Sequence, residues 1–229
     1  AASFGNGNFM GISGSTWQRD ADGNLLLDWK TGYPLTSTDA TKPIGNREPS
    51  FIGGLNNTFV YKNWELSFLF DFRKGGDILN GTEYLLAYNG LSKVTENRGD
   101  KLSFTGMALN PETKAYEMIT KEVVATEDYY RDIYSLNTPN FVETVNWLRL
   151  RSLSLTYSLP PDFLKRSKIF KAASVTATGT NLWLWTNYSG MDPEVSAAGA
   201  GVIGSGSVGV DYAGVPATAG VTFGLNLKF

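Results

Sequence analysis

Residues 222–229 read Thr-Phe-Gly-Leu-Asn-Leu-Lys-Phe, and this stretch decides the fold class. Phe223, Leu225, Leu227 and Phe229 alternate with small or polar residues, so an extended strand here carries one apolar face and one polar face. A water-soluble sheet rarely ends on an exposed aromatic strand, because such an edge invites aggregation. In a transmembrane β-barrel the apolar face meets lipid, the polar face lines the lumen, and closure removes the edge. The stretch therefore favours a transmembrane β-barrel.

The composition excludes several classes of function. The 229 residues include no cysteine and no histidine, so this chain can build no disulfide, no Cys/His zinc site and no Ser–His catalytic pair. Its 22 acidic and 20 basic side chains nearly cancel, which gives no electrostatic reason to expect nucleic-acid binding. No apolar run approaches the about 18 residues of a membrane-spanning helix, whereas barrel strands need only about 9–11 residues each. We expect no enzyme activity and no cofactor.

The acidic run Asp20-Ala21-Asp22-Gly23-Asn24 is the strongest candidate for a metal site. In a calcium loop of the EF-hand type, glycine stands at the sixth position and a glutamate closes the loop. Here the glycine is fourth and no glutamate follows at the required distance. The run therefore predicts the tip of a hairpin and no metal site.

A hairpin is predicted over residues 51–73. Residues 51–61 form its first strand, Lys62-Asn63 its two-residue turn, and residues 64–73 its second strand. One face of the second strand carries only large apolar side chains: Trp64, Leu66, Phe68, Phe70 and Phe72. The core of a β-sandwich mixes side-chain sizes so that two sheets interdigitate. A row of uniform bulk, opposite the charged Glu65, Asp71 and Arg73, predicts contact with lipid on one side and with water on the other.

The remaining strands follow a long polar segment. Residues 74–140 are too long for a connection inside a soluble sandwich and are expected to be an extracellular loop, helical around residues 77–88. A strand over residues 147–159 changes phase, which predicts a bulge near Arg151–Ser152. Residues 161–171 form a short connection with one helical turn. A strand over residues 173–185, a loop over residues 189–219 and the final strand complete the chain.

Aromatic side chains gather near the ends of these strands. With the C-terminus in the periplasm, Tyr61, Trp64, Tyr157 and Phe229 lie at the inner membrane interface, and Trp147, Trp183 and Trp185 lie at the outer one. Two aromatic girdles of this kind are typical of transmembrane barrels. The alternative is that these rings fill the core of a soluble sheet.

Several ordered motifs resemble one family. The final octapeptide resembles the C-terminal insertion signal of bacterial outer-membrane barrels, with Thr222, Gly224, Leu227 and Phe229 at its positions. Residues 147–160 resemble the "LRLKNLTLGYTLP" segment of the SusC/RagA-type TonB-dependent transporters, and residues 181–196 resemble their "NL…YSGYDPEVS" signature. Residues 44–63 resemble the family's "IGNPNPDF..GLN…YKN" hairpin. The chain departs from the family at residues 217–220 and in the Asp-rich loop near residue 20.

The resemblance implies the C-terminal strands of a plugged barrel of about 22 strands. Residues 1–229 are then a C-terminal segment of this barrel, without the N-terminal plug and the first strands, so the sheet edge at residues 221–229 stays open. The implied location is the outer membrane of a Gram-negative, Bacteroidota-type bacterium. The implied function is import of oligomeric nutrients, glycans or peptides.

The resemblance also implies partners. A SusD-like lipoprotein would cover the extracellular loops, TonB would supply energy through the N-terminal part, and the barrel assembly machinery would insert the chain into the lipid bilayer. Residues that contact substrate are not identified by the sequence, and the weak candidates are Tyr129, Tyr130, Asp192 and Glu194. Two alternatives remain open: a soluble carbohydrate-binding or adhesin β-domain, and a passive porin.

Overall fold

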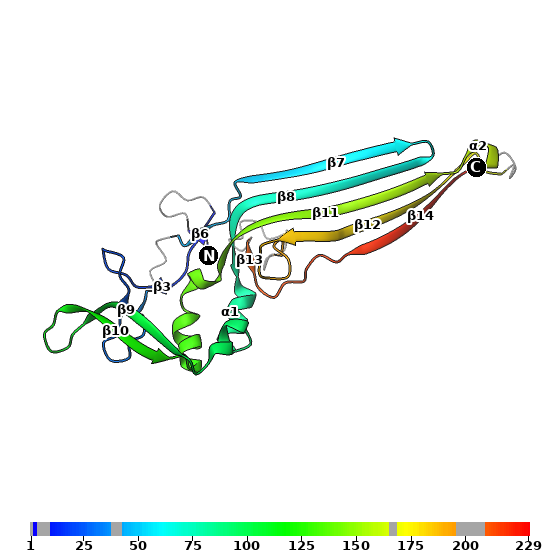
Figure 1. Ribbon diagram of the computed structural model, residues 1–229. Helices are drawn as coiled ribbons and strands as arrows, with labels where there is room; N and C mark the ends of the chain where they lie inside the picture. The colour runs from blue at the N-terminus through cyan, green and yellow to red at the C-terminus, as the bar shows by residue number, and fades with distance from the viewer. Residues whose placement is uncertain (1, 4–9, 38–42, 165–168, 196–208) are drawn as a thin grey trace. The chain divides into compact units, whose positions relative to one another are not determined.

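The computed structural model describes residues 2–3, 10–37, 43–164, 169–195 and 209–229 and divides into two units (Figure 1). The sheet unit comprises residues 49–76, 144–193 and 215–229. The loop unit comprises residues 1–48, 77–143 and 194–214.

The sheet unit is built from five long strands. They are β7 (Phe51–Tyr61), β8 (Trp64–Asn80), β11 (Val142–Ser158), β12 (Ala172–Thr186) and β14 (Gly220–Lys228), and they lie side by side in this order (Figure 1). Each strand of the pairs β7–β8, β11–β12 and β12–β14 runs antiparallel to its partner. The predicted all-β class is confirmed.

Both edges of this sheet are open. Among the described strands, β7 pairs only with β8, and β14 pairs only with β12. The predicted open edge at residues 221–229 is therefore confirmed, and the five strands do not close a barrel.

The predicted hairpin forms with the predicted turn. Tyr61 pairs with Trp64 across Lys62-Asn63, and Lys62 has a φ of 54°, as the tight turns of β-hairpins require. Gly53 pairs with Phe72, whose ring lies over the glycine: a Cβ at Gly53 would stand 2.6 Å from the Phe72 ring. The strand β8 extends to Asn80, beyond the predicted end at residue 73.

The predicted bulge is found at the expected level of the sheet. Leu150 pairs with Trp183 and Ser152 pairs with Thr180, so Arg151 alone faces two residues of β12. The additional residue thus belongs to β12, where Asn181 has a φ of 51°. Asparagine adopts this left-handed conformation more readily than most residues. The phase change in residues 147–159 predicted the position of the bulge but not the strand that contains the extra residue.

Hydroxyl groups join β11 and β12 on one face. Ser154 Oγ lies 2.8 Å from Thr178 Oγ1, and Thr156 Oγ1 lies 2.9 Å from Thr176 Oγ1. Cross-strand pairs of this kind stabilise antiparallel sheets. The connection between these strands contains the predicted helical turn, α2 (Pro161–Leu164).

The loop unit is ordered over most of residues 77–143, which we expected to be loop. After β8 come α1 (Gly81–Tyr88) and the 3₁₀ helix η2 (Lys93–Asn97). The hairpin β9 (Lys101–Leu109) and β10 (Tyr116–Val124), the π-helix η3 (Tyr129–Tyr134) and the 3₁₀ helix η4 (Thr138–Phe141) follow. The predicted helix start at residue 77 was wrong, because Asn80 caps α1 by accepting a hydrogen bond from Glu83 N at 2.9 Å.

Short strands complete the loop unit. They are β1 (Ala2–Ser3), β2 (Gly11–Ile12), β3 (Thr16–Trp17), β4 (Leu26–Leu27), β5 (Thr36–Ser37), β6 (Gly45–Asn46) and β13 (Val210–Asp211). The strand β13 runs parallel to the end of β8, and β4 runs parallel to β9. The predicted tip at residues 20–24 is confirmed: Arg19 pairs with Leu25, and Asp20 Oδ1 accepts hydrogen bonds from the backbone of Asp22 and Asn24.

Tyrosine rings form the core of the loop unit. Ala125, Tyr129 and Tyr130 are buried there, and a shell of half-buried side chains packs on them: Tyr33, Val94, Leu102, Phe104, Ile133 and Tyr134. Across the residues that the structure describes, no helix has both the length and the apolar character needed to cross a membrane.

Candidate functional site

One face of the sheet unit exposes an extended apolar surface. The register places Phe59 beside Leu66, Val175 beside Leu225, and Ala177 beside Phe223. Ten large side chains of this face are between 37% and 77% exposed: Leu55, Phe59, Tyr61, Trp64, Leu66, Leu155, Val175, Val221, Phe223 and Leu225. Exposed apolar surfaces of this extent mark contact with a membrane or a partner protein.

The predicted lipid-facing row lies within this surface. Trp64 and Leu66 are exposed, whereas Phe68, Phe70 and Phe72 are half-buried. The cause is contact between neighbouring rings: the Phe68 centroid lies 6.0 Å from that of Phe59 and 5.5 Å from that of Phe70. On the opposite face of β8, Asp71 forms an ion pair with Arg151 of β11, with 2.8 Å between Oδ2 and Nε. Large apolar side chains thus lie on one face of β8 and the Asp71–Arg151 ion pair on the other.

The aromatic side chains that we assigned to the two girdles differ in their exposure. Near the β7–β8 turn, the Trp64 and Tyr157 rings lie 4.5 Å apart. On β12, Trp183 and Trp185 are 58% and 53% exposed. Trp147 differs, because only 9% of it is exposed. Its ring lies beneath the Arg151 guanidinium, with 6.0 Å between the guanidinium carbon and the ring centroid.

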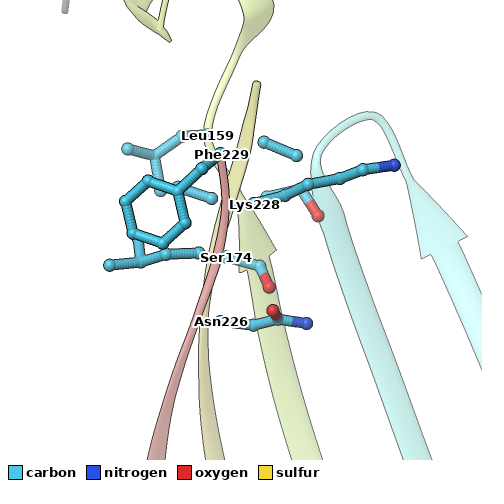
Figure 2. Close-up of a pocket in the computed structure, with 9 residues that line it drawn as sticks. Leu159, Ser174, Asn226, Lys228 and Phe229 are labelled. Carbon is cyan, nitrogen blue, oxygen red and sulfur yellow. The ribbon is translucent and has the colours of Figure 1, made fainter. Parts of the chain in front are cut away.

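The C-terminal residues border a cleft of about 600 Å³ at the start of β12 and the end of β14 (Figure 2). Figure 2 shows the Phe229 ring with Leu159 on one side of β14 and the Lys228 and Asn226 side chains on the other. The Phe229 ring also lies 5.2 Å from that of Phe170. The C-terminal aromatic is therefore held against the connection that precedes β12.

The other three residues of the predicted insertion signal lie along β14. Thr222 pairs with Thr178, Gly224 with Thr176, and Leu227 with Ala173. Every residue of β14 is exposed. These residues thus lie on an exposed edge strand of the described sheet, to which another strand can add.

Two of the weak substrate candidates form the core of the loop unit. Tyr129 and Tyr130 are each 5% exposed, and the Tyr129 ring contacts Tyr33, Phe104 and Tyr134. Burial raises the pKa of Tyr129 to about 12, with a smaller contribution from the neighbouring tyrosines. These rings stabilise the loop and present no open face to a substrate.

Asp192 and Glu194 differ in their surroundings. Asp192 is 3% exposed and forms an ion pair with Arg149, with 2.5 Å between Oδ1 and Nη2. Its other oxygen accepts a hydrogen bond from Ala217 N at 3.2 Å. The carboxylate of Asp192 therefore connects Arg149 of β11 with the backbone of Ala217. Glu194, in contrast, is exposed. Arg149 was not among the predicted site residues, although an arginine between leucines in a strand is a signal for a buried ion pair.

Metal ligands do not cluster in the described part of the chain. No group of three or more Asp or Glu residues able to hold a metal ion occurs there.

The sequence of this chain is similar to part of known receptors. No family model matches the sequence. The chain is 30% identical over 225 residues to the TonB-dependent receptor P3 of Formosa agariphila. The aligned residues cover 97% of this chain and 21% of the receptor. The chain is 31% identical over 202 residues to the TonB-dependent receptor P26 of the same organism, covering 87% of this chain and 19% of that receptor. The chain thus spans about a fifth of the length of these curated relatives.

The fold is similar to that of a solved transporter. The RagAB peptide importer in its closed-closed state matches 97% of this chain and 22% of the solved chain, with a TM-score of 0.57 and 20% identity. Its open-open state gives a TM-score of 0.60 at 19% identity over 95% of this chain and 22% of the solved chain. By sequence this chain belongs with the TonB-dependent receptors, and its fold is similar to that of part of the RagAB peptide importer.

Proposed function

We propose that the protein to which this chain belongs imports oligomeric nutrients across the outer membrane, driven by TonB. The observation that carries this proposal is the division of the sheet unit into an exposed apolar face and a face of hydroxyl and charged groups. The first face, with Phe59, Leu66 and Leu225, suits the hydrocarbon of a bilayer, and the second, with Thr156 and Thr176, suits a water-filled lumen. The similarity to TonB-dependent receptors supports the energy source.

The orientation follows from the positions of the turns. The C-terminus, the Lys62-Asn63 turn and the α2 connection lie at one end of the sheet (Figure 1). Short turns face the periplasm in outer-membrane barrels, and long loops face outward. We therefore propose that residues 77–143 and 194–214 are extracellular and that residues 62–63 and 159–171 are periplasmic.

A SusD-like lipoprotein is the proposed extracellular partner. The RagAB importer, by its name, consists of two components, and the fold of one of them is similar to this chain. The ordered hairpin β9–β10 and the exposed Glu194 belong to the proposed extracellular part. Loops held on a rigid sheet provide the kind of surface on which a second protein docks.

The proposed substrate class is oligomeric: peptides or glycans. The solved relatives transport peptides according to their names. The chain contains no histidine and no cysteine, and its described residues include no group of three or more carboxylates able to hold a metal ion. Transport without chemical change is therefore the proposed activity.

Uptake by whole cells tests the proposal. Cells that produce the intact protein are given a fluorescent oligopeptide or a fluorescent oligoglycan, and its accumulation is compared with and without a functional tonB gene. The proposal requires uptake that depends on both the protein and TonB. Uptake that continues without TonB would instead favour a passive porin.

Affinity purification tests the partner. The intact protein is purified from outer membranes in mild detergent through a tag in the loop of residues 110–115 between β9 and β10. Co-purification of a surface lipoprotein in stoichiometric amount supports the proposed complex. Recovery of the protein from the soluble fraction without detergent would favour a soluble binding or adhesin domain.

A further inference from the structure

A second cleft lies within the loop unit. It has a volume of about 340 Å³ and is bordered by the end of α1, the residue after η2, and the π-helix η3. Its lining includes Tyr88, Arg98, Glu127 and Arg131. A cleft of this size accommodates one monomer unit of a peptide or glycan.

Arg98 brings an uncommitted positive charge to this cleft. Its side chain is exposed, and within the described part of the chain its guanidinium makes no hydrogen bond and no ion pair. The side chain lies across Gly90, where a Cβ would stand 2.9 Å from Arg98 Nη1. Gly90 also has a φ of 71°, so a glycine here allows both the turn after α1 and the approach of the arginine.

Arg131 is held in place on the other side of the cleft. Its Nη2 donates a hydrogen bond to the Tyr88 hydroxyl at 3.3 Å, and its guanidinium carbon lies 5.1 Å from the centre of the Tyr88 ring. Glu127 approaches to 3.6 Å from Arg131 Nη1. The buried Nε of Arg131 has no hydrogen-bond acceptor in the described part of the chain. A buried donor without an acceptor is costly unless a ligand or water supplies one.

The backbone that carries Arg131 is unusual. Arg131 belongs to the π-helix Tyr129–Tyr134, in which Ser135 N donates to Tyr130 O at 3.0 Å. Such turns are rare and occur often at functional sites. Here the π-helix turns Tyr129 and Tyr130 into the core while Arg131 borders the cleft.

We propose that this cleft binds a carboxylate group of the imported oligomer, with Arg98 and Arg131 as the binding residues. Two guanidinium groups against the single carboxylate of Glu127 leave the cleft with a net positive charge. A guanidinium offers two parallel N–H donors that match the two oxygens of a carboxylate. The import of an oligomer through this protein is taken from the proposed function; the binding of a carboxylate depends on the cleft alone.

The carboxylate has two possible sources, an acidic peptide side chain and a uronic acid. The intact transporter is purified in detergent and titrated at low salt, by calorimetry, with four probes. Two are the blocked tripeptides N-acetyl-Gly-Glu-Gly-amide and N-acetyl-Gly-Gln-Gly-amide; two are methyl glucuronide and methyl glucoside. We expect one acid to bind at least about tenfold more tightly than its neutral counterpart. The acid that does so identifies the source.

Three variants link the affinity to the cleft. Arg98→Ala should weaken binding of the acidic probe about tenfold or more, because a charged hydrogen-bond donor is lost. Arg131→Lys keeps the charge but loses the two-pronged donor, so it should weaken binding less. Glu127→Gln removes the competing carboxylate and should strengthen binding. Equal affinity of the wild-type and Arg98→Ala proteins for the acids, or equal affinity of acids and neutral probes, would overturn the inference.

The outcome separates this inference from the proposed function. Arg98 also lies near the C-terminal end of α1, where a positive charge can stabilise the helix. A lower thermal unfolding midpoint of the Arg98→Ala protein, with an unchanged affinity for the acidic probe, would assign Arg98 that structural role and overturn the inference. Carboxylate binding that Arg98→Ala abolishes supports the inference even in a protein that shows no TonB-dependent uptake, which would overturn the proposed function alone.

Discussion

The Arg149 guanidinium and the Asp192 carboxylate form an ion pair inside the sheet unit, with 2.5 Å between Nη2 and Oδ1 and each side chain 3% exposed. Arg149 belongs to β11, and Asp192 follows the end of β12. Asp192 also binds the backbone N–H of Ala217, three residues before β14. One carboxylate thus connects three separate segments of the chain.

Removal of this carboxylate should destabilise the protein. In the Asp192→Asn variant the buried Arg149 charge loses its counterion, at a cost of about 3–5 kcal/mol. The double variant Arg149→Met, Asp192→Asn removes the uncompensated charge and should recover part of this loss. Urea unfolding of the intact protein in detergent, followed by the electrophoretic shift of the folded barrel, measures the difference. An unchanged midpoint for Asp192→Asn would show that the pair contributes nothing to stability.

The apolar row on β8 should face lipid. Phe68→Arg places a charge at the centre of this row, where it should cost about 2–4 kcal/mol near the middle of the bilayer. Ser67→Arg is the matched control, because adjacent residues of a strand point to opposite faces, and its cost should be much smaller. Folding of both variants into lipid vesicles, titrated with urea, measures the two costs. Equal losses would contradict the assignment of the faces.

The bulge should depend on Asn181. A β-branched side chain tolerates a φ of 51° poorly, so Asn181→Val should cost about 1–2 kcal/mol. It also removes the hydrogen bond from Asn181 Nδ2 to Thr218 O at 3.2 Å. Asn181→Gly loses the same bond but adopts the conformation freely, so the difference between the two variants isolates the backbone effect. A valine variant as stable as the glycine variant would show that the bulge moves to another residue.

Much of the sheet was predictable because local patterns define it. Alternation of side chains predicted the hairpin with its turn at Lys62-Asn63, and a phase change predicted the level of the bulge. Adjacent glycines such as Gly75 and Gly76 usually indicate the end of a strand. Here both have positive φ, yet β8 continues through them to Asn80, beyond its predicted end. Pairing with β13 helps to hold the end of β8, and a contact so distant in sequence leaves no local pattern.

The candidate site was less predictable, because it depends on which side chains are buried. Tyr129, Tyr130 and Asp192 were chosen as polar or aromatic loop residues, but tertiary contacts bury all three. Arg131 lies 33 positions after Arg98, and Gly90 lies earlier still; only the fold brings them to one cleft. No spacing rule connects a residue after α1, a residue after the 3₁₀ helix η2 and a residue of the π-helix η3.

High pH should loosen the loop unit through Tyr129. Burial raises the pKa of this phenol from 10.0 to about 12, so the folded state disfavours the ionised form. The associated stability is complete below pH 10 and is lost as the pH rises toward 12; it amounts to about 2–3 kcal/mol. Absorbance of tyrosinate near 295 nm, followed during a pH titration, should show a late phase that Tyr129→Phe removes. Persistence of that phase in the variant would assign it to another tyrosine.

Phe229 should be needed for assembly more than for transport. Its ring packs on Phe170 at the end of the sheet, and β14 presents an open edge to which a further strand can add. Deletion of Phe229 should lower the amount of protein in the outer membrane while uptake per inserted molecule stays nearly unchanged, because the residue lies at the proposed periplasmic end and not on the loops. The measurements are immunoblots of outer-membrane fractions and uptake of a fluorescent oligomer, normalised to the inserted protein.

Lys228→Gln is the control, because the Lys228 side chain lies on the opposite side of β14 from the Phe229 ring (Figure 2). This variant should leave the amount of inserted protein unchanged. Normal insertion combined with lost uptake would instead make the C-terminus part of the transport mechanism.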